Sequence, residues 1–151
     1  MSVQDEIKEL KQRISELEEQ VEEEQTFPKY NDFYWYINAK GKILCNTWEG
    51  FKFEKDMLTI GNVYQTENEA VFALEKLKVE AELRKFSRPF KDEDENFEII
   101  WNNYENDIEL DWSERIVRQS VIYFESGEIA EKAIEAVGKE RIKKYIFGVE
   151  A

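Results

Sequence analysis

The segment GNVYQTENEAVFALEKL, residues 61–77, decides the predicted fold because a similar segment, VIYFESGEIAEKAIEAV, follows at residues 121–137. The two segments align at a constant offset of 60 residues. Each predicts the end of a strand, an N-cap at Thr66 or Ser126, and an amphipathic helix with apolar residues at helical spacing. Two interpretations stay open: a tandem structural repeat, or two ordinary strand-to-helix junctions that share stereotyped capping chemistry.

Around these segments the sequence predicts an α+β protein. We expect an N-terminal coiled-coil helix and then a tandem β-β-β-α repeat, which forms a mostly antiparallel sheet of about six strands with helices packed on it. Each predicted half contains a hairpin, a third strand (61–65 or 116–124) and a helix. The expected boundaries are a dimerising helix at 1–25, a linker at 26–32 and a domain at 33–151, with halves 33–86 and 96–138 and a short helix at 139–147.

The N-terminal segment has a heptad pattern of apolar residues. The predicted dimer interface consists of Ile7, Leu10, Ile14, Leu17 and Val21, with Val3 preceding them. Ile and Val at the a positions and Leu at the d positions favour a parallel pair of helices, in a homodimer or a larger assembly. The alternative is an amphipathic helix that folds back on its own domain.

The predicted helix that begins at Glu67 has two apolar stripes. The first is shared with the helix of residues 127–137, whereas the second has no counterpart there and consists of Phe72, Val79, Leu83 and Phe86. A surface helix needs only one buried stripe, so something must cover the second. The candidates are the C-terminal part of the chain, a partner subunit or a target protein, and the stripe is therefore a candidate contact.

Composition excludes several classes of site. The 151 residues include no histidine and one cysteine, Cys45, so histidine-dependent catalysis, histidine-ligated metals and disulfide frameworks are excluded. The glycines are isolated, so no nucleotide-binding loop is predicted, and the acidic run at 92–95 lacks calcium-loop spacing. We expect no catalytic residues, no metal and no cofactor. We also expect no membrane span and no signal peptide.

The charge of the chain is unevenly distributed. The net charge is −13, with −6 in residues 1–25 and −9 in residues 91–114. Such acidity argues against direct binding to nucleic acid or anionic membranes. A partner surface is predicted on one sheet face, where it would engage a protein with a basic surface. It consists of Tyr34, Tyr36, Glu98, Glu109 and Asp111. The alternative is that these charges serve solubility alone.

Several motifs resemble those of small, uncharacterised proteins encoded by phages and prophages of Gram-positive bacteria. They are Trp35-Tyr36-Ile37 with Gly41, Ile43 and Trp48, the segment from Gly61 to Thr66 with Glu69-Ala70 and Leu77-Lys78, and the ending from Arg141 to Val149. The resemblance covers roughly residues 33–149 and carries no catalytic residue. It implies a viral accessory protein in the cytoplasm of a bacterial host, acting against host defence.

The leading hypothesis is therefore a non-enzymatic, dimeric accessory protein that binds and inhibits a host protein through an acidic surface. One alternative is a protein that sequesters a small molecule such as a nucleotide signal, with Arg88, Arg115 and Arg118 as the candidate anion-binding residues. Another is a structural or assembly component of a virion.

Overall fold

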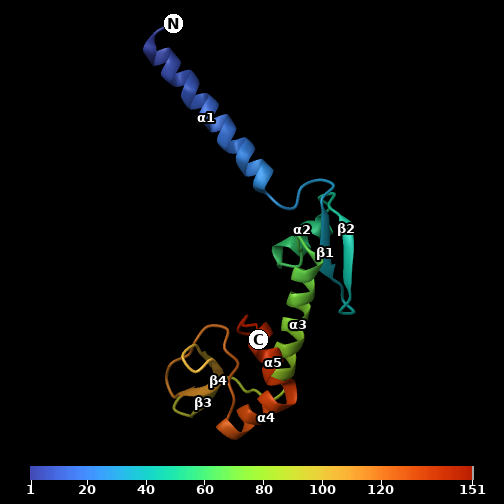
Figure 1. Ribbon diagram of the computed structural model, residues 1–151, viewed down its shortest axis with the longest axis vertical. Helices are drawn as coiled ribbons and strands as arrows, with labels where there is room; N and C mark the ends of the chain where they lie inside the picture. Colours follow the sequence, from blue (N-terminus) through green and yellow to red (C-terminus); the bar gives the residue numbers. More distant parts are fainter. Residues whose placement is uncertain (151) are drawn as a thin grey trace. The chain divides into compact units, whose positions relative to one another are not determined.

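The computed structural model describes residues 1–150, and Figure 1 shows the course of the chain. Within these residues the fold is α+β, with a long N-terminal helix and two antiparallel β-hairpins in separate two-stranded sheets. Ala151, the last residue of the expected domain, lies outside them. In chain order the elements are α1 (Val3–Gln25), β1 (Phe33–Ile37), β2 (Ile43–Thr47), α2 (Lys52–Thr59), α3 (Glu67–Arg84), β3 (Asn96–Asn102), β4 (Asp107–Ser113), α4 (Gly127–Val137) and α5 (Lys139–Tyr145).

The chain divides into two compact units within α3. The first is Met1–Ala70, and the second begins at Val71. The boundary between the units lies inside α3, whereas the halves expected from the sequence, 33–86 and 96–138, keep this helix whole and stay a prediction. The reason lies in the side chains of α3, since Ala70 is fully buried at the start of the helix while Val79 and Leu83 belong to the core of the second unit.

In the first unit, β1 and β2 form the predicted hairpin. Phe33 pairs with Thr47 at its open end, and Ile37 pairs with Ile43 at the turn. The side-chain oxygen of Asn38 accepts hydrogen bonds from the backbone N–H groups of Lys40 and Lys42, which closes the turn.

Strong local signals place the helix starts where the sequence predicts them. Ser126 caps α4 by accepting a hydrogen bond from the N–H of Ile129 at 3.2 Å. At the start of α3, the Thr66 hydroxyl accepts from the N–H of Glu69, and the Glu69 carboxylate accepts from the N–H of Thr66. This reciprocal arrangement is a capping box, and it contains the predicted N-cap at Thr66.

The prediction of one sheet with about six strands is wrong. Both expected third strands shrink to isolated bridges: Tyr64 pairs with Trp35, while Tyr123 pairs with Arg88 and Phe124 with Phe97. Left-handed backbone at Gly61 (φ 78°) and at Ser120 (φ 59°) interrupts the extended conformation before each bridge, and a helix cap follows it. In the first unit the side chain of Asn62 also replaces strand backbone, because it exchanges two hydrogen bonds with the peptide groups of Ile37.

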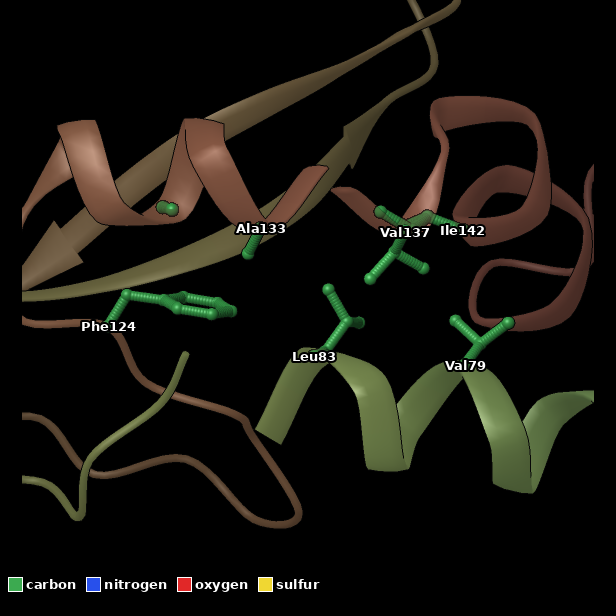
Figure 2. Close-up of a cluster of buried hydrophobic side chains, with 7 residues drawn as sticks. Val79, Leu83, Phe124, Ala133, Val137 and Ile142 are labelled. Atoms are coloured by element: carbon green, nitrogen blue, oxygen red, sulfur yellow. The ribbon is translucent and has the colours of Figure 1, made fainter. Parts of the chain in front are cut away.

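The core of the second unit forms between α3, α4 and α5. Figure 2 shows Val79 and Leu83 of α3 directed toward Val137 and Ile142, with Ala133 and Phe124 beside them. Ala130 completes this buried cluster. The β3–β4 hairpin packs partly buried side chains against the cluster: Phe97, Ile99, Ile108 and Leu110. The four side chains share one face of the hairpin because their positions alternate along the strands.

No helix in residues 1–150 is long and apolar enough to cross a membrane.

Candidate functional site

The apolar seam of α1 is uncovered in the single chain. Its side chains are between 44% and 71% exposed: Val3, Ile7, Leu10, Ile14, Leu17 and Val21. The helix itself is well formed, since Ser2 and Asp5 make a capping box at its start. Glu6 and Arg13 beside the seam are exposed too, and the ion pair between Arg13 and Glu16, at 3.4 Å, lies within the helix. The seam is thus an apolar stripe along a helix of 23 residues, and the described chain leaves it open to solvent.

The second stripe of α3 belongs largely to the core rather than to an external contact. Val79 is fully buried, and Leu83 is 3% exposed. Phe72 packs against Tyr145 of α5 with ring centroids 5.2 Å apart, and Phe86 is 36% exposed. The C-terminal part of the chain, the first of the three candidates, therefore covers the middle of the stripe, whereas Phe72, which is 38% exposed, and Phe86 stay partly open to solvent. Val79 and Leu83 are corrected accordingly, because side chains buried in the core of the second unit cannot form an interface with a partner protein.

The stripe that α3 shares with α4 is the more exposed one in the second unit. Leu77 is 54% exposed, whereas Val137, its counterpart in α4, is 5% exposed. The two helices therefore differ in burial at this position, although Ala70 and its counterpart Ala130 are both fully buried.

The five residues of the predicted partner surface do not share one sheet face. Tyr34 and Tyr36 lie in the β1–β2 hairpin, whereas Glu98, Glu109 and Asp111 lie in the β3–β4 hairpin, a separate sheet. Tyr34 is fully buried against Trp48, and its ring lies 5.6 Å from the Trp48 ring. Glu98 is 6% exposed. These two residues are therefore corrected, while Tyr36, Glu109 and Asp111 remain partly exposed.

Glu98 is buried because an arginine from the loop after β4 lies over it. Nη1 of Arg118 is 2.6 Å from Oε1 of Glu98, and Nη2 of the same guanidinium is 3.7 Å from Oδ2 of Asp111. Burial raises the pKa of Glu98 above its usual value, Arg118 opposes that rise, and the charge of Asp111 adds to it. Arg118 is therefore engaged within the chain.

A cavity of about 190 Å³ lies beside this ion pair, within the second unit. Its apolar walls come from α3, β3, the segment before α4, α5 and the two residues after α5: Leu83, Ile99, Val121, Ile122, Phe124, Ile142, Ile146 and Phe147. The charged residues that line it are Glu80, Arg84 and Glu98. Glu80 pairs with Arg84 at 3.7 Å, and Glu98 pairs with Arg118, so the charges around the cavity are balanced.

Asn96 anchors the acidic turn that precedes β3. Its buried amide accepts hydrogen bonds from Arg88 (2.7 Å) and from the N–H of Lys91 (2.8 Å). Its Nδ2 donates to carbonyls that include those of Asp94 and Ser113. The turn is thus tied to β4, and Arg88, a candidate for anion binding, supports the turn instead.

A second buried carboxylate, Glu54, caps α2 from inside the first unit. It accepts hydrogen bonds from the N–H groups of Glu49 and Phe51, both at 3.0 Å. Burial would raise its pKa, but the neighbouring Tyr34 hydroxyl and these backbone donors outweigh that effect, so the pKa of Glu54 is lowered. Sequence patterns did not reveal Glu54, because Phe51, the residue that it caps, is not an N-cap type.

Among residues 1–150 no group of three or more Cys, Asp or Glu side chains could hold a metal ion. Comparisons of the chain with family models, with curated proteins and with solved structures found no match.

Proposed function

We propose that the protein is a non-enzymatic dimer that binds another protein. In this proposal α1 pairs in parallel with α1 of a second copy, and the rest of each chain presents an acidic surface to a basic partner. The observation that carries the proposal is the uncovered apolar seam of α1. Full burial of one Leu, Ile or Val side chain contributes about 1.5–3 kcal/mol, so covering this seam on two helices would contribute to the stability of a dimer.

The charges beside the seam favour a second copy as its occupant. In parallel register Glu6 faces Lys11 of the partner helix, and Arg13 faces Glu18, and each attraction occurs twice by symmetry. An antiparallel pair would instead place Arg13 near Arg13. About three heptads are only marginally stable as an isolated coil, so contacts elsewhere in the dimer would assist the helices.

The acidic surface is proposed for the second unit. Residues 91–114 carry a net charge of −9, and Glu109 and Asp111 of β4 are the two partly exposed carboxylates that remain from the predicted set in this unit. Complementary charge mainly speeds association and selects partners. Two copies of the surface on one dimer would raise the effective concentration of the second contact.

The resemblance to phage and prophage proteins supports a partner in the bacterial host. On that basis we propose a host defence protein in the cytoplasm as the target. The described residues offer no assigned catalytic group, so inhibition would act through binding.

We also infer that the two halves are a tandem repeat. The bridging residues Tyr64 and Phe124 stand at the same 60-residue offset as the caps Thr66 and Ser126. Each half then contains a hairpin, an isolated bridge and a helix in this order. This order supports a tandem repeat over the alternative of two ordinary strand-to-helix junctions with similar capping.

Light scattering tests the dimer. The full chain should have the mass of a dimer, and the double variant L10K/L17K should have the mass of a monomer, because a charge at a d position opposes burial. The matched control Q12K/E19K changes two exposed residues on the opposite face of α1 and should remain dimeric. A dimeric L10K/L17K would contradict the assignment of the seam.

Charge reversal tests the acidic surface. E109K/D111K should capture much less of the partner from a host lysate than the unmodified chain does. The control E131K/E135K makes the same change of charge on exposed residues of α4 and should capture normally. Equal loss in both variants would show that net charge, and not this surface, determines capture.

A further inference from the structure

The two halves differ at one position, where a side-chain amide in the first unit makes the hydrogen bonds that a neighbouring strand would make. In the first unit the Nδ2 group of Asn62 donates to the carbonyl of Ile37 at 2.7 Å, and Oδ1 of Asn62 accepts from the N–H of Ile37 at 2.9 Å. The Asn62 amide thus pairs with Ile37 as the peptide group of a neighbouring strand would.

The register of the bridges identifies the equivalent position in the second unit. Ile37 lies two residues after Trp35, and Asn62 lies two residues before Tyr64, the bridge partner of Trp35. In the second unit the corresponding bridge joins Phe97 and Phe124. Two residues after Phe97 is Ile99, which corresponds to Ile37, and two residues before Phe124 is Ile122, which corresponds to Asn62. Ile122 has no polar side-chain group, so it cannot pair with Ile99 as Asn62 pairs with Ile37.

The peptide groups of Ile99 face this unfilled position. Alternate residues of an antiparallel strand direct their N–H and carbonyl groups to the same edge, and Phe97 uses that edge to bond Phe124 in both directions, at 3.0 and 2.8 Å. Among the hydrogen bonds of residues 71–150, none joins the N–H or carbonyl of Ile99 to residues 120–124. Ile99 and Ile122 both line the cavity of about 190 Å³.

We infer that this cavity binds a small neutral molecule that carries a carboxamide on an apolar body, with the carboxamide paired to the peptide groups of Ile99. The precedent is the Asn62 amide, which makes the same two hydrogen bonds to Ile37. A ligand with one ring fits the volume, since a cavity of about 150 Å³ accommodates benzene. The paired charges around the cavity favour a neutral group over an ion. A nucleotide is too large, since sites for larger ligands have volumes of roughly 300–1,000 Å³.

The apolar body of the ligand would lie against buried side chains of the core. Leu83, Phe124 and Ile142 line the cavity and are each no more than 3% exposed. These apolar side chains form no hydrogen bonds with the carboxamide of the ligand or with water. Along this wall the ligand has no polar partner, so the orientation is set where the carboxamide meets the peptide groups of Ile99.

Nuclear magnetic resonance titration of the full chain with benzamide tests the inference. The backbone amide signal of Ile99 should shift saturably, with a dissociation constant on the order of 1 mM for so small a ligand. The amide signal of Ile37 is an internal control, because Asn62 already occupies its partner position, and it should not shift. Benzoate and toluene should bind at least tenfold more weakly, since neither can both donate to and accept from Ile99.

Two substitutions complete the test. I122N should supply the missing amide from within the chain, slow the exchange of the Ile99 amide proton and abolish benzamide binding. I122V keeps an apolar residue there and should bind benzamide like the unmodified protein. The inference is overturned if benzamide leaves the Ile99 signal unchanged in the unmodified chain, or if benzoate or toluene binds as tightly. Because the first of these outcomes needs no variant, the test holds even if I122N fails to fold.

Discussion

The guanidinium of Arg118 lies 2.6 Å from the carboxylate of Glu98, which is only 6% exposed. Removing water from a carboxylate penalises its charged form, and a neighbouring cation restores part of the loss. Here burial has the larger effect, so the pKa of Glu98 lies above the reference value of 4.5. Folding therefore favours the protonated form of this group.

That shift predicts a dependence of stability on pH. The folded state binds the Glu98 proton more tightly than the unfolded chain does, because the pKa of Glu98 is raised by folding. The contribution of this proton to the free energy of unfolding is complete below pH 4.5, and it is lost as the pH rises through the raised pKa of the folded state. The free energy of unfolding of the unmodified protein, minus that of E98Q, should fall over this window. Urea denaturation of both proteins at a series of pH values measures the difference and cancels the titration of other groups. A difference that rises with pH would contradict the direction of the shift.

Leu83 and Leu77 provide a test of which face of α3 is the core. Leu83 is 3% exposed within the core of the second unit, so L83A should lower the free energy of unfolding by about 2–5 kcal/mol. Leu77 is 54% exposed, so L77A should change the free energy of unfolding by no more than about 0.5 kcal/mol, since alanine also has a high helix propensity. Equilibrium urea denaturation measures both. The reverse order would show that the stripe shared with α4 is buried instead.

The hydrogen bonds between Asn62 and Ile37 predict a local effect in the first unit. N62A removes both bonds and should lower stability by roughly 1–3 kcal/mol, because each contributes about 0.5–1.5 kcal/mol. Hydrogen exchange should report it directly, as the Ile37 amide proton should exchange at least tenfold faster. Asn68 is exposed on α3, and N68A is the matched control. Unchanged exchange at Ile37 in N62A would show that these bonds add no protection.

Local features of the sequence predicted both hairpins and the helices α1, α3, α4 and α5, but they did not establish α2. The spacing of Thr66 and Glu69 marks the start of α3, and Gly138 follows the end of α4, since both signals act over a few residues. Alternation along β3 and β4 likewise predicted the second hairpin. The reduction of the third strands to isolated bridges could not be predicted in this way, because a side-chain amide at Asn62 and left-handed backbone at Ser120 do not alter the hydrophobic periodicity.

The predicted partner surface was wrong at Glu98, because the burial of this residue depends on a contact with a residue distant in the sequence. Alternation placed Glu98 on a solvated face, but Arg118, twenty residues later in the chain, lies over it. Both stripes of α3 satisfy helical spacing, and only the packing of α4 and α5 shows which one is buried. The seam of α1 differs from both cases, since a heptad pattern needs no knowledge of the rest of the chain.

The parallel register of α1 can be tested by cross-linking. In a parallel pair the two Leu10 side chains meet at a d position, so the variant L10C/C45S, whose single cysteine replaces Leu10, should form a disulfide-linked dimer on mild oxidation. Cysteine in place of Gln12, in Q12C/C45S, lies on the opposite face of the helix and should cross-link at least tenfold more slowly. Replacing Cys45 is necessary because that residue is exposed and would form disulfides of its own. In an antiparallel pair Leu10 would lie opposite a position near Ile14, so slow cross-linking of both variants would contradict the parallel register while leaving a dimer detectable by its mass.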